Sequence, residues 1–415
     1  MQTNLAPSFK GTREGEEAEA ILRKCVHCGF CTATCPTYQL LGDELDGPRG
    51  RIYLIKQVLE GQVATSKTQS HLDRCLTCRN CETTCPSGVE YGRLVDIGRK
   101  IVGEQVGRSG ADRLKRTLLA KGLNSPLFAP AMKIGQALRW AVPGSLKAKV
   151  PEKQAAALLA KGRPAPRHAR RMLLLEGCVQ NAMAPNINNA AARVLDRLGV
   201  SLVSVPKAGC CGALNYHLDF QEAGLDNMRR NIDAWWPLVE SGAIEAIAMT
   251  ASGCGTTVKD YGHLLAHDPA YAAKAARVSA LTRDLSELVV DEPTLPAALK
   301  SIAAKSGPKK IAYHPPCSLQ HGQQVRGKAE QVLKDAGFEL TPVAESHLCC
   351  GSAGAYSVLN PEISAQLKER KLGNLEAGKP DVICSANIGC LTHLQSGTAT
   401  PVRHWVEVID AAFNG

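Results

Sequence analysis

The spacing of apolar residues predicts a helical first part of the chain. In the stretch after residue 50, apolar side chains at Ile52, Ile55, Val58 and Leu59 recur with the period of a helix. A second helix is predicted at 92–106, where the sequence reads GRLVDIGRKIVGEQV. We therefore expect this region to be helical and not a small β-rich ferredoxin.

From residue 171 onwards the pattern changes to short apolar runs that alternate with helical segments. RMLLLEGC predicts a strand followed by a loop, NAAARVLDRLG a helix and VSLVSVP another strand, and GAIEAIAMTASGC predicts a strand that ends at a cysteine. Strands that alternate with helices are typical of βα units with a parallel sheet.

This second part of the chain contains an internal repeat. Cys178, Cys210, Cys211 and Gly212 recur as Cys317, Cys349, Cys350 and Gly351, each 139 positions further on (178 to 317, 210 to 349). Cys254 has a counterpart in Cys390, and RVLDRLGVSLVSVP resembles QVLKDAGFELTPVA. Two copies of one α/β unit are the simplest explanation, with a joint near residues 290–308.

These patterns predict a multidomain fold. The expected parts are a flexible polar tail at 1–20, an α-helical ferredoxin-like domain at 21–115, a basic helical linker at 116–170, and repeated α/β domains with small parallel sheets at 171–300 and 308–415.

Composition and cysteine usage narrow the class of protein. The chain has 415 residues, of which 44% are hydrophobic and 21% charged, as in soluble globular proteins. The start of the chain lacks an apolar signal region, and no run reaches the ~18 apolar residues that span a bilayer. We therefore expect a cytoplasmic protein whose 17 cysteines are reduced, and clustered reduced thiols usually bind metal.

Positive charge is concentrated in one segment. Residues 99–170 contain 16 Lys and Arg against three acidic residues, a local net charge of +13, so the remainder of the +10 chain sums to −3. Such a segment suits an anionic membrane surface or an acidic partner, although a solvated linker explains it equally well. Ile134, Leu138 and Val142 share one helical face, which predicts either an interfacial helix or one that packs on its own protein. No nucleic-acid-binding motif is present.

Two cysteine grids carry the most specific chemistry. CVHCGFCTATCP and CLTCRNCETTCP both follow the pattern C-x2-C-x2-C-x3-C-P. In two-cluster ferredoxins this pattern binds two [4Fe–4S] clusters, and the fourth cysteine of each grid serves the other cluster. The predicted ligands of the first cluster are Cys25, Cys28, Cys31 and Cys85, and those of the second cluster are Cys75, Cys78, Cys81 and Cys35. Tetrahedral zinc is the alternative, but zinc sites typically use two ligand pairs.

The repeated cysteines resemble the cysteine-rich CCG domain of heterodisulfide reductases, lactate-utilisation proteins and the anaerobic glycerol-3-phosphate dehydrogenase anchor subunit. The full CCG pattern ends in C-x-x-C, whereas this chain has Thr257 in the first copy and His393 in the second copy at the last position. A third cluster, a zinc ion or no metal are all consistent with the remaining thiols. The candidate ligands are Cys178, Cys210, Cys211 and Cys254 in the first copy, and Cys317, Cys349, Cys350, Cys390 and His393 in the second copy.

Across its whole length the chain closely resembles the iron–sulfur subunits of bacterial glycolate oxidase. The grids alone fit many electron carriers, and the stretch GDELDGPRGRIYLIKQVLEG between them does most to indicate this family, together with CCGAL and CCGSAGAYSVLNPEIS. The resemblance implies a complex in which flavoprotein subunits oxidise glycolate to glyoxylate at FAD. This chain would pass the electrons on toward quinone, with peripheral contact at the cytoplasmic face of the inner membrane.

The chain itself is not expected to carry the site that oxidises the substrate. It contains no G-x-G-x-x-G fingerprint that opens a βα unit, so FAD is expected only on the partner subunits. The alternatives are the equivalent subunit of a lactate or glycerol-3-phosphate dehydrogenase complex, and a CCG-type disulfide reductase subunit.

Overall fold

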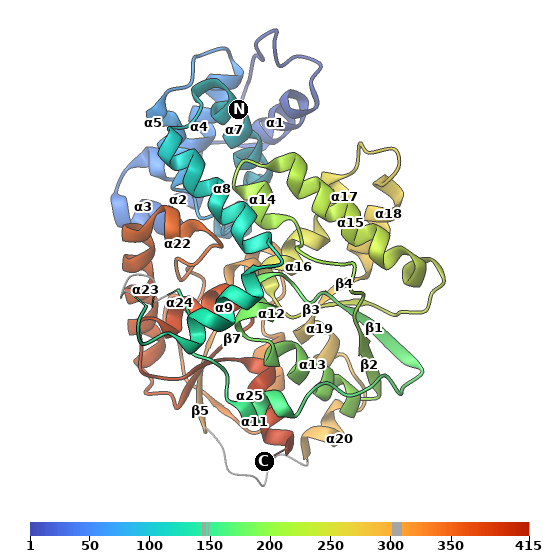
Figure 1. The fold of residues 1–415 in the computed structure, drawn as a ribbon. Helices are drawn as coiled ribbons and strands as arrows, with labels where there is room; N and C mark the ends of the chain where they lie inside the picture. Colours follow the sequence, from blue (N-terminus) through green and yellow to red (C-terminus); the bar gives the residue numbers. More distant parts are fainter. Residues whose placement is uncertain (143–146, 148, 301–308, 415) are drawn as a thin grey trace. The chain divides into compact units, whose positions relative to one another are not determined.

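The computed structural model describes residues 1–142, 147, 149–300 and 309–414 (Figure 1). Its contacts divide the chain into two compact units. The first unit comprises Met1–Thr117 and His347–Lys371, and the second comprises Leu118–Ser346 and Leu372–Gly415.

The first unit is helical, as the apolar spacing predicts. Its elements are α1 (Arg13–Lys24), α2 (Phe30–Ala33), α3 (Pro36–Leu41), η1 (Glu44–Asp46), α4 (Pro48–Leu59), α5 (Ser66–Asp73), α6 (Asn80–Thr84), α7 (Tyr91–Val106), the first part of α8 (Gly110–Asn124), α22 (Tyr356–Leu359) and most of α23 (Pro361–Glu376). The predicted stripe of α4 is buried in one core with Leu94 and Val95 of α7. This core fixes the helices that flank the cysteine grids.

Residues 1–20 do not form the predicted flexible tail, and that prediction is wrong. The Met1 ammonium donates to the carbonyl oxygens of Leu22 at 2.9 Å and Cys25 at 2.6 Å. Leu5 is buried in the core of the first unit, and α1 already begins at Arg13. Because this stretch is mostly polar, its composition does not indicate the few apolar contacts that it makes with residues distant in the sequence.

The segment His347–Lys371 belongs to the first unit although it lies within the second repeat. The Tyr356 hydroxyl donates to the Arg74 carbonyl oxygen at 3.0 Å, and Lys115 Nζ donates to the Val358 carbonyl oxygen at 2.7 Å. The predicted domain at 308–415 is therefore interrupted in the structure.

The second unit contains both sheets. Its elements are α9 (Phe128–Ala137), α11 (Ala156–Ala160), β1 (Arg170–Leu174), α12 (Val179–Met183), α13 (Asn186–Arg197), β2 (Val200–Val203), α14 (Ala213–His217), α15 (Gln221–Glu240), β3 (Ile247–Met249), α16 (Ser252–Lys259), α17 (Tyr261–Leu264), α18 (Ala272–Leu281), β4 (Thr282–Asp284), α19 (Leu285–Val290), α20 (Leu295–Lys300), β5 (Lys310–His314), η2 (Ser318–Gly322), α21 (Lys328–Asp335), β6 (Glu339–Leu340), β7 (Val382–Ser385), α24 (Ile388–Gln395), β8 (Val402–His404) and α25 (Trp405–Asn414).

Each repeat forms a four-stranded parallel sheet, with strand orders β2-β1-β3-β4 and β6-β5-β7-β8. Alternate residues of a strand point to opposite faces of its sheet. Met172 and Leu174 of β1 accordingly enter one core cluster, whereas Leu173 enters another. The first of these clusters contains residues of both repeats, so the two sheets share one core.

The two repeats pack against each other reciprocally. Helix α13 of the first repeat contacts α25 of the second, and α19 of the first contacts α21 of the second. In the first repeat α13 comes after β1 and α19 after β4, and in the second repeat α21 comes after β5 and α25 after β8. Each contact therefore joins the helix after the first strand of one repeat to the helix after the last strand of the other, as in a pseudo-twofold interface. The Arg193–Asp410 ion pair, at 2.7 Å, holds the α13–α25 contact.

The predicted linker at 116–170 contributes α9 and α11 and the second part of α8. Residues 143–146 and 148 of this linker, and residues 301–308 of the predicted joint near 290–308, lie outside the described residues. Within the described part of the chain, no helix has both the length and the apolar character needed to cross a bilayer.

Candidate metal centres

The two cysteine grids adopt the same unusual backbone turn. His27 and Gly29 in the first grid have φ angles of 58° and 84°, and the equivalent residues Thr77 and Arg79 have 53° and 58°. Three of these are not glycine, so the left-handed conformation carries strain that the surrounding fold must hold in place. The turn aims the Thr77 N–H at Cys75 Sγ, at 3.4 Å.

The fourth cysteine of the second grid lies with the first three cysteines of the first grid. One cavity of the first unit is lined by Cys25, Cys28, Cys31, Cys81 and Cys85, together with residues of α4 and of the two turns. The two grids also meet directly, because the hydroxyl oxygens of Thr34 and Thr84 lie 3.1 Å apart. The structure thus brings together the four thiols that the spacing assigns to the first cluster.

The electrostatic neighbours of the central cysteines divide into the same two groups. Burial, followed by the nearby Cys25, Cys28 and Cys85, raises the pKa of Cys31 to about 11. Burial also raises the pKa of Cys81, with Cys78, Cys75 and Cys35 among the groups that add to the shift.

Crowded thiols of this kind resist ionisation unless a cation compensates their charge. The residues of both groups therefore fit an iron–sulfur cluster, whose iron would supply that positive charge.

The second group of thiols has a polar and positively charged environment. The buried Tyr91 donates from its hydroxyl to Cys75 Sγ at 3.6 Å, and Thr37 Oγ1 lies 3.3 Å from Cys35 Sγ. Arg51 is only 1% exposed, and its Nη1 donates to Thr37 Oγ1 at 3.2 Å. Arg99 adds a second guanidinium, whose Nη2 donates to the Cys75 carbonyl oxygen at 2.6 Å. These groups favour added negative charge on the sulfurs.

Arg51 is held in place by the buried carboxylate of Asp46. Asp46 also pairs with Arg74 at 2.9 Å and contacts His71 at 3.1 Å. Asp43 lies close to Asp46 and His71, but Arg51 and Arg74 already neutralise the buried carboxylate of Asp46. This cluster is therefore an ion-pair network and not a cation site.

The first group of thiols lies closer to solvent. Cys28 is exposed, whereas Cys35, Cys75 and Cys81 of the second group are buried. Val26 and Phe30, on either side of Cys28, are 67% and 60% exposed. An electron would reach the surface of this unit most directly through the first group.

The four cysteines of the first repeat also come together. They follow the carboxyl ends of the parallel strands β1, β2 and β3, which meet at one edge of the sheet. Side-chain hydrogen bonds link Cys178 to Cys210, Cys210 to Cys211 and Cys211 to Cys254. The sequence predicted Cys254 at the end of a strand, but it lies in the first turn of α16.

Hydrogen bonds between these cysteines shift their pKa values in opposite directions. Hydrogen bonds from Cys178 and Cys211 lower the pKa of Cys210 to about 3, because they stabilise its thiolate. The same bonds raise the pKa values of Cys178 and Cys211. Four neighbouring thiols are a donor set that suits iron or zinc.

The glycine of each CCG motif is required by the backbone. Gly212 has a φ of 95°, and a Cβ atom there would lie 2.6 Å from the Gly224 carbonyl oxygen. In the second repeat, Gly351 has a φ of 87°, and a Cβ atom would lie 2.6 Å from the Ser364 carbonyl oxygen. In both repeats only glycine lets a helix pack against the turn that carries the paired cysteines.

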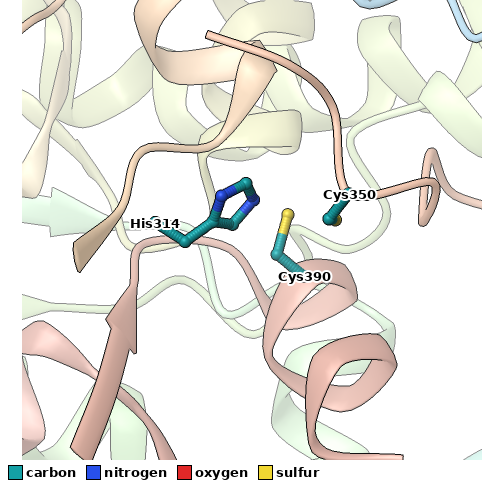
Figure 2. Close-up of side chains that lie close together, drawn as sticks. All are labelled: His314, Cys350 and Cys390. Carbon is teal, nitrogen blue, oxygen red and sulfur yellow. The ribbon is translucent and has the colours of Figure 1, made fainter. Parts of the chain in front are cut away.

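The second repeat brings His314 and Cys390 together within the second unit. His314 ends β5, and Cys390 lies in α24, which follows the neighbouring strand β7. A ring nitrogen of His314 and Cys390 Sγ lie within 4.8 Å of one another, and both residues are buried. Figure 2 shows the imidazole and the thiol directed toward the same space. Cys350, which is also labelled there, belongs to the first unit.

The other predicted ligands of this repeat lie on several elements. Cys317 precedes η2, Cys349 belongs with Cys350 to the first unit, and His393 is buried in α24.

Comparison with known families matches both parts of the chain. The model of a 4Fe–4S dicluster domain matches residues 21–89, and that of a cysteine-rich domain, CCG, matches residues 172–259 and 311–395. The glycolate oxidase iron–sulfur subunit of Escherichia coli is 55% identical over 99% of both chains. This chain belongs to the family of glycolate oxidase iron–sulfur subunits.

More distant relatives support the same assignment. The probable glycolate oxidase iron–sulfur subunit of Bacillus subtilis is 30% identical over 91% of this chain and 89% of its own. Lactate utilization protein A of Bacillus licheniformis is 28% identical, and the match covers 56% of this chain but 96% of that protein. The glycolate oxidase iron–sulfur subunits therefore match this chain along most of its length, whereas the lactate utilization protein matches little more than half.

Sequence reasoning missed the groups that surround the second set of thiols. Tyr91, Thr37, Arg51 and Arg99 come from different helices, so no motif joins them. One signal was available, since Arg51 precedes Ile55 by four residues and so lies on the apolar face of its helix. An arginine on a buried face needs a partner charge, which here is Asp46.

Proposed function

We propose that this chain is the electron-transfer subunit of a glycolate-oxidising complex. Partner flavoprotein subunits oxidise glycolate to glyoxylate at FAD, and this chain carries the electrons onward to a quinone acceptor. The observation that carries the proposal is the grouping of the grid cysteines, in which Cys85 lies with the first three thiols of the other grid. Whole-length similarity to glycolate oxidase iron–sulfur subunits supports the choice of substrate.

In this proposal Cys25, Cys28, Cys31 and Cys85 hold one [4Fe–4S] cluster, and Cys75, Cys78, Cys81 and Cys35 hold the other. Such clusters accept and release single electrons without large rearrangement of their ligands. The chain fixes the thiolates by its two strained turns and by the helices that flank them.

The side chains around the second site tune where an electron prefers to reside. The Tyr91 hydroxyl donates to Cys75 Sγ, and Arg51 and Arg99 place positive charge nearby. Hydrogen bonds and positive charge at the sulfurs stabilise the reduced state and so raise the potential. We infer that electrons enter at the exposed first site and are drawn toward the buried second site.

Substitution of Cys28 by serine tests the ligand assignment. We expect Cys28→Ser to lose much of its iron and to uncouple flavin reduction from the acceptor. Cys384→Ala is the matched control, because Cys384 is a buried thiol in β7 that lies in the apolar core. Iron content and electron-transfer rate at wild-type levels in Cys28→Ser would refute the assignment.

We further propose a metal centre at Cys178, Cys210, Cys211 and Cys254, as a third cluster or a zinc ion. The hydrogen-bonded chain of four thiols supports it. Anaerobic metal analysis of Cys254→Ser should show loss of the metal of this centre while the spectra of the two clusters remain. Identical metal content in Cys254→Ser and wild type would remove this centre from the proposal.

The second repeat is proposed as a similar centre, with Cys317, Cys349, Cys350, Cys390 and His393 as the predicted ligands. His314 joins this list because of its distance to Cys390. Metal content after His314→Ala, compared with His393→Ala, shows which of the two histidines takes part.

The two alternative functions make different predictions for the purified complex. A subunit of a lactate or glycerol-3-phosphate dehydrogenase complex would have its clusters reduced by those substrates and not by glycolate. A CCG-type disulfide reductase would turn over a disulfide, but Thr257 and His393 occupy the positions of the last cysteines of that motif. Titration of the complex with each substrate, followed by cluster spectra, separates the three functions.

A further inference from the structure

One face of α9 and of the turn after it carries large apolar side chains that point away from the protein. Leu127, Ile134, Leu138 and Trp140 are 73%, 62%, 49% and 81% exposed. Leu127, Ala131, Ile134 and Leu138 follow one another at intervals of four, three and four residues, so they form a continuous stripe on one side of the helix. We call Leu127, Ala131, Ile134, Leu138 and Trp140 the α9 stripe.

The opposite side of α9 is already packed. Phe128 and Met132 contact the main core of the second unit, and Gln136 Nε2 donates to the Met183 carbonyl oxygen at 3.2 Å. The helix is therefore anchored by one face in a way that leaves the α9 stripe turned outward. Helices of soluble proteins normally place apolar residues on only one side, so the second stripe needs another explanation.

The charged residues of the segment that carries the α9 stripe are all basic. Residues 118–151 contain no Asp or Glu and five basic residues, which are Lys121, Lys133, Arg139, Lys147 and Lys149. Arg139 reaches Glu152 at 3.1 Å, while the lysines at 121, 133 and 147 are exposed. An apolar stripe with a tryptophan at its end and lysines beside it is the pattern of a helix that lies in an anionic lipid interface.

We propose that the α9 stripe binds the surface of an anionic phospholipid bilayer, with Trp140 at the level of the headgroups. Leu127, Ile134 and Leu138 would insert among the acyl chains, and the lysines would contact the phosphates. This inference adds a membrane-binding surface to the proposed function and rests on that function only for the quinone acceptor, which resides in the bilayer. The absence of Asp and Glu from residues 118–151 favours lipid over an average protein partner, whose interface would mix both signs of charge.

Vesicle flotation of the anaerobically purified full chain tests the proposal. We expect the chain to float with vesicles of phosphatidylglycerol and phosphatidylethanolamine, and not with pure phosphatidylcholine. Added salt should weaken the binding because exposed charges are screened. Ile134→Asp should weaken it about tenfold or more, since it replaces the burial of a large apolar side chain by that of a charge.

Val63→Asp provides the matched control, because Val63 is 85% exposed in the first unit and lies outside the stripe. It adds the same charge but should leave vesicle binding unchanged. Trp140 gives an independent signal, since it is 81% exposed, whereas Trp235 and Trp405 are fully buried and Trp236 is partly buried. Its fluorescence should shift to the blue with anionic vesicles, and the shift should disappear in Trp140→Phe.

The proposal is overturned if the chain does not float with anionic vesicles, or if Ile134→Asp and Val63→Asp weaken vesicle binding equally. It is also overturned if Ile134→Asp leaves vesicle binding intact but releases a partner subunit from the complex. Failure of the proposed function would look different, because glycolate would then fail to reduce the clusters of the intact complex whether or not vesicles bind.

Discussion

Removal of the Tyr91 hydroxyl should lower the potential of the second cluster without removing the cluster. Tyr91 is buried and donates to Cys75 Sγ at 3.6 Å, so Tyr91→Phe deletes one hydrogen bond and leaves the packing of the ring. A sulfur in the reduced cluster carries more negative charge and holds this hydrogen bond more strongly than one in the oxidised cluster.

The size of the shift follows from the strength of that bond. A hydrogen bond to a charged group contributes about 1.5–3 kcal/mol, and a donor at this longer distance should distinguish the two redox states by about 1 kcal/mol. For a one-electron couple, a tenfold change in equilibrium is about 59 mV, or about 1.4 kcal/mol. We therefore expect the midpoint potential to fall by about 40 mV.

Redox titration followed by electron paramagnetic resonance measures this shift for each cluster. Tyr53→Phe is the matched control, because Tyr53 is 46% exposed and carries the same hydroxyl at the surface of the first unit. It should leave the potential of the second cluster unchanged. A full complement of iron in Tyr91→Phe with an unchanged or higher potential would refute the reasoning.

Three further predictions concern stability. His404 is buried, accepts from the Val406 N–H and lies 2.9 Å from the Thr250 carbonyl oxygen, and burial lowers its pKa from 6.5 to about 4. A lowered folded-state pKa means that stability is lost as the pH falls from about 6.5 to about 4, by up to about 3 kcal/mol. Urea unfolding of His404→Asn should lack this slope. Asp46→Asn should destabilise the first unit by about 3 kcal/mol, because it removes the carboxylate that pairs with the buried Arg51, and thermal unfolding measures this loss. Gly212→Ala should cost about 2–4 kcal/mol by the same measurement, and Gly242→Ala, which has a positive φ but no close neighbour, should cost less.

The parts of the fold that depend on nearby residues could be predicted from the sequence. The stripe of α4 and the alternating strands and helices after residue 170 are local patterns, and both appear in the structure. The repeat of cysteines predicted two related α/β units, because equal spacing over 139 positions (178 to 317) is hard to obtain otherwise.

The parts that depend on distant contacts could not be predicted. The first residues look like a polar tail, and only the fold shows that the Met1 ammonium reaches the end of α1. Similarly, nothing local in His347–Lys371 indicates that Tyr356 bonds to the Arg74 carbonyl oxygen in the first unit. The environment of the second thiol group has the same origin, since it is assembled from several helices.

The exchange of the fourth cysteines between the two grids is the central claim, and an iron-anomalous crystal structure of the anaerobically purified chain tests it most directly. The account predicts that Cys85 Sγ binds the cluster held by Cys25, Cys28 and Cys31, and that Cys35 Sγ binds the other. Maps in which each grid holds its cluster with its own fourth cysteine, or in which zinc replaces iron at these eight thiols, would contradict it.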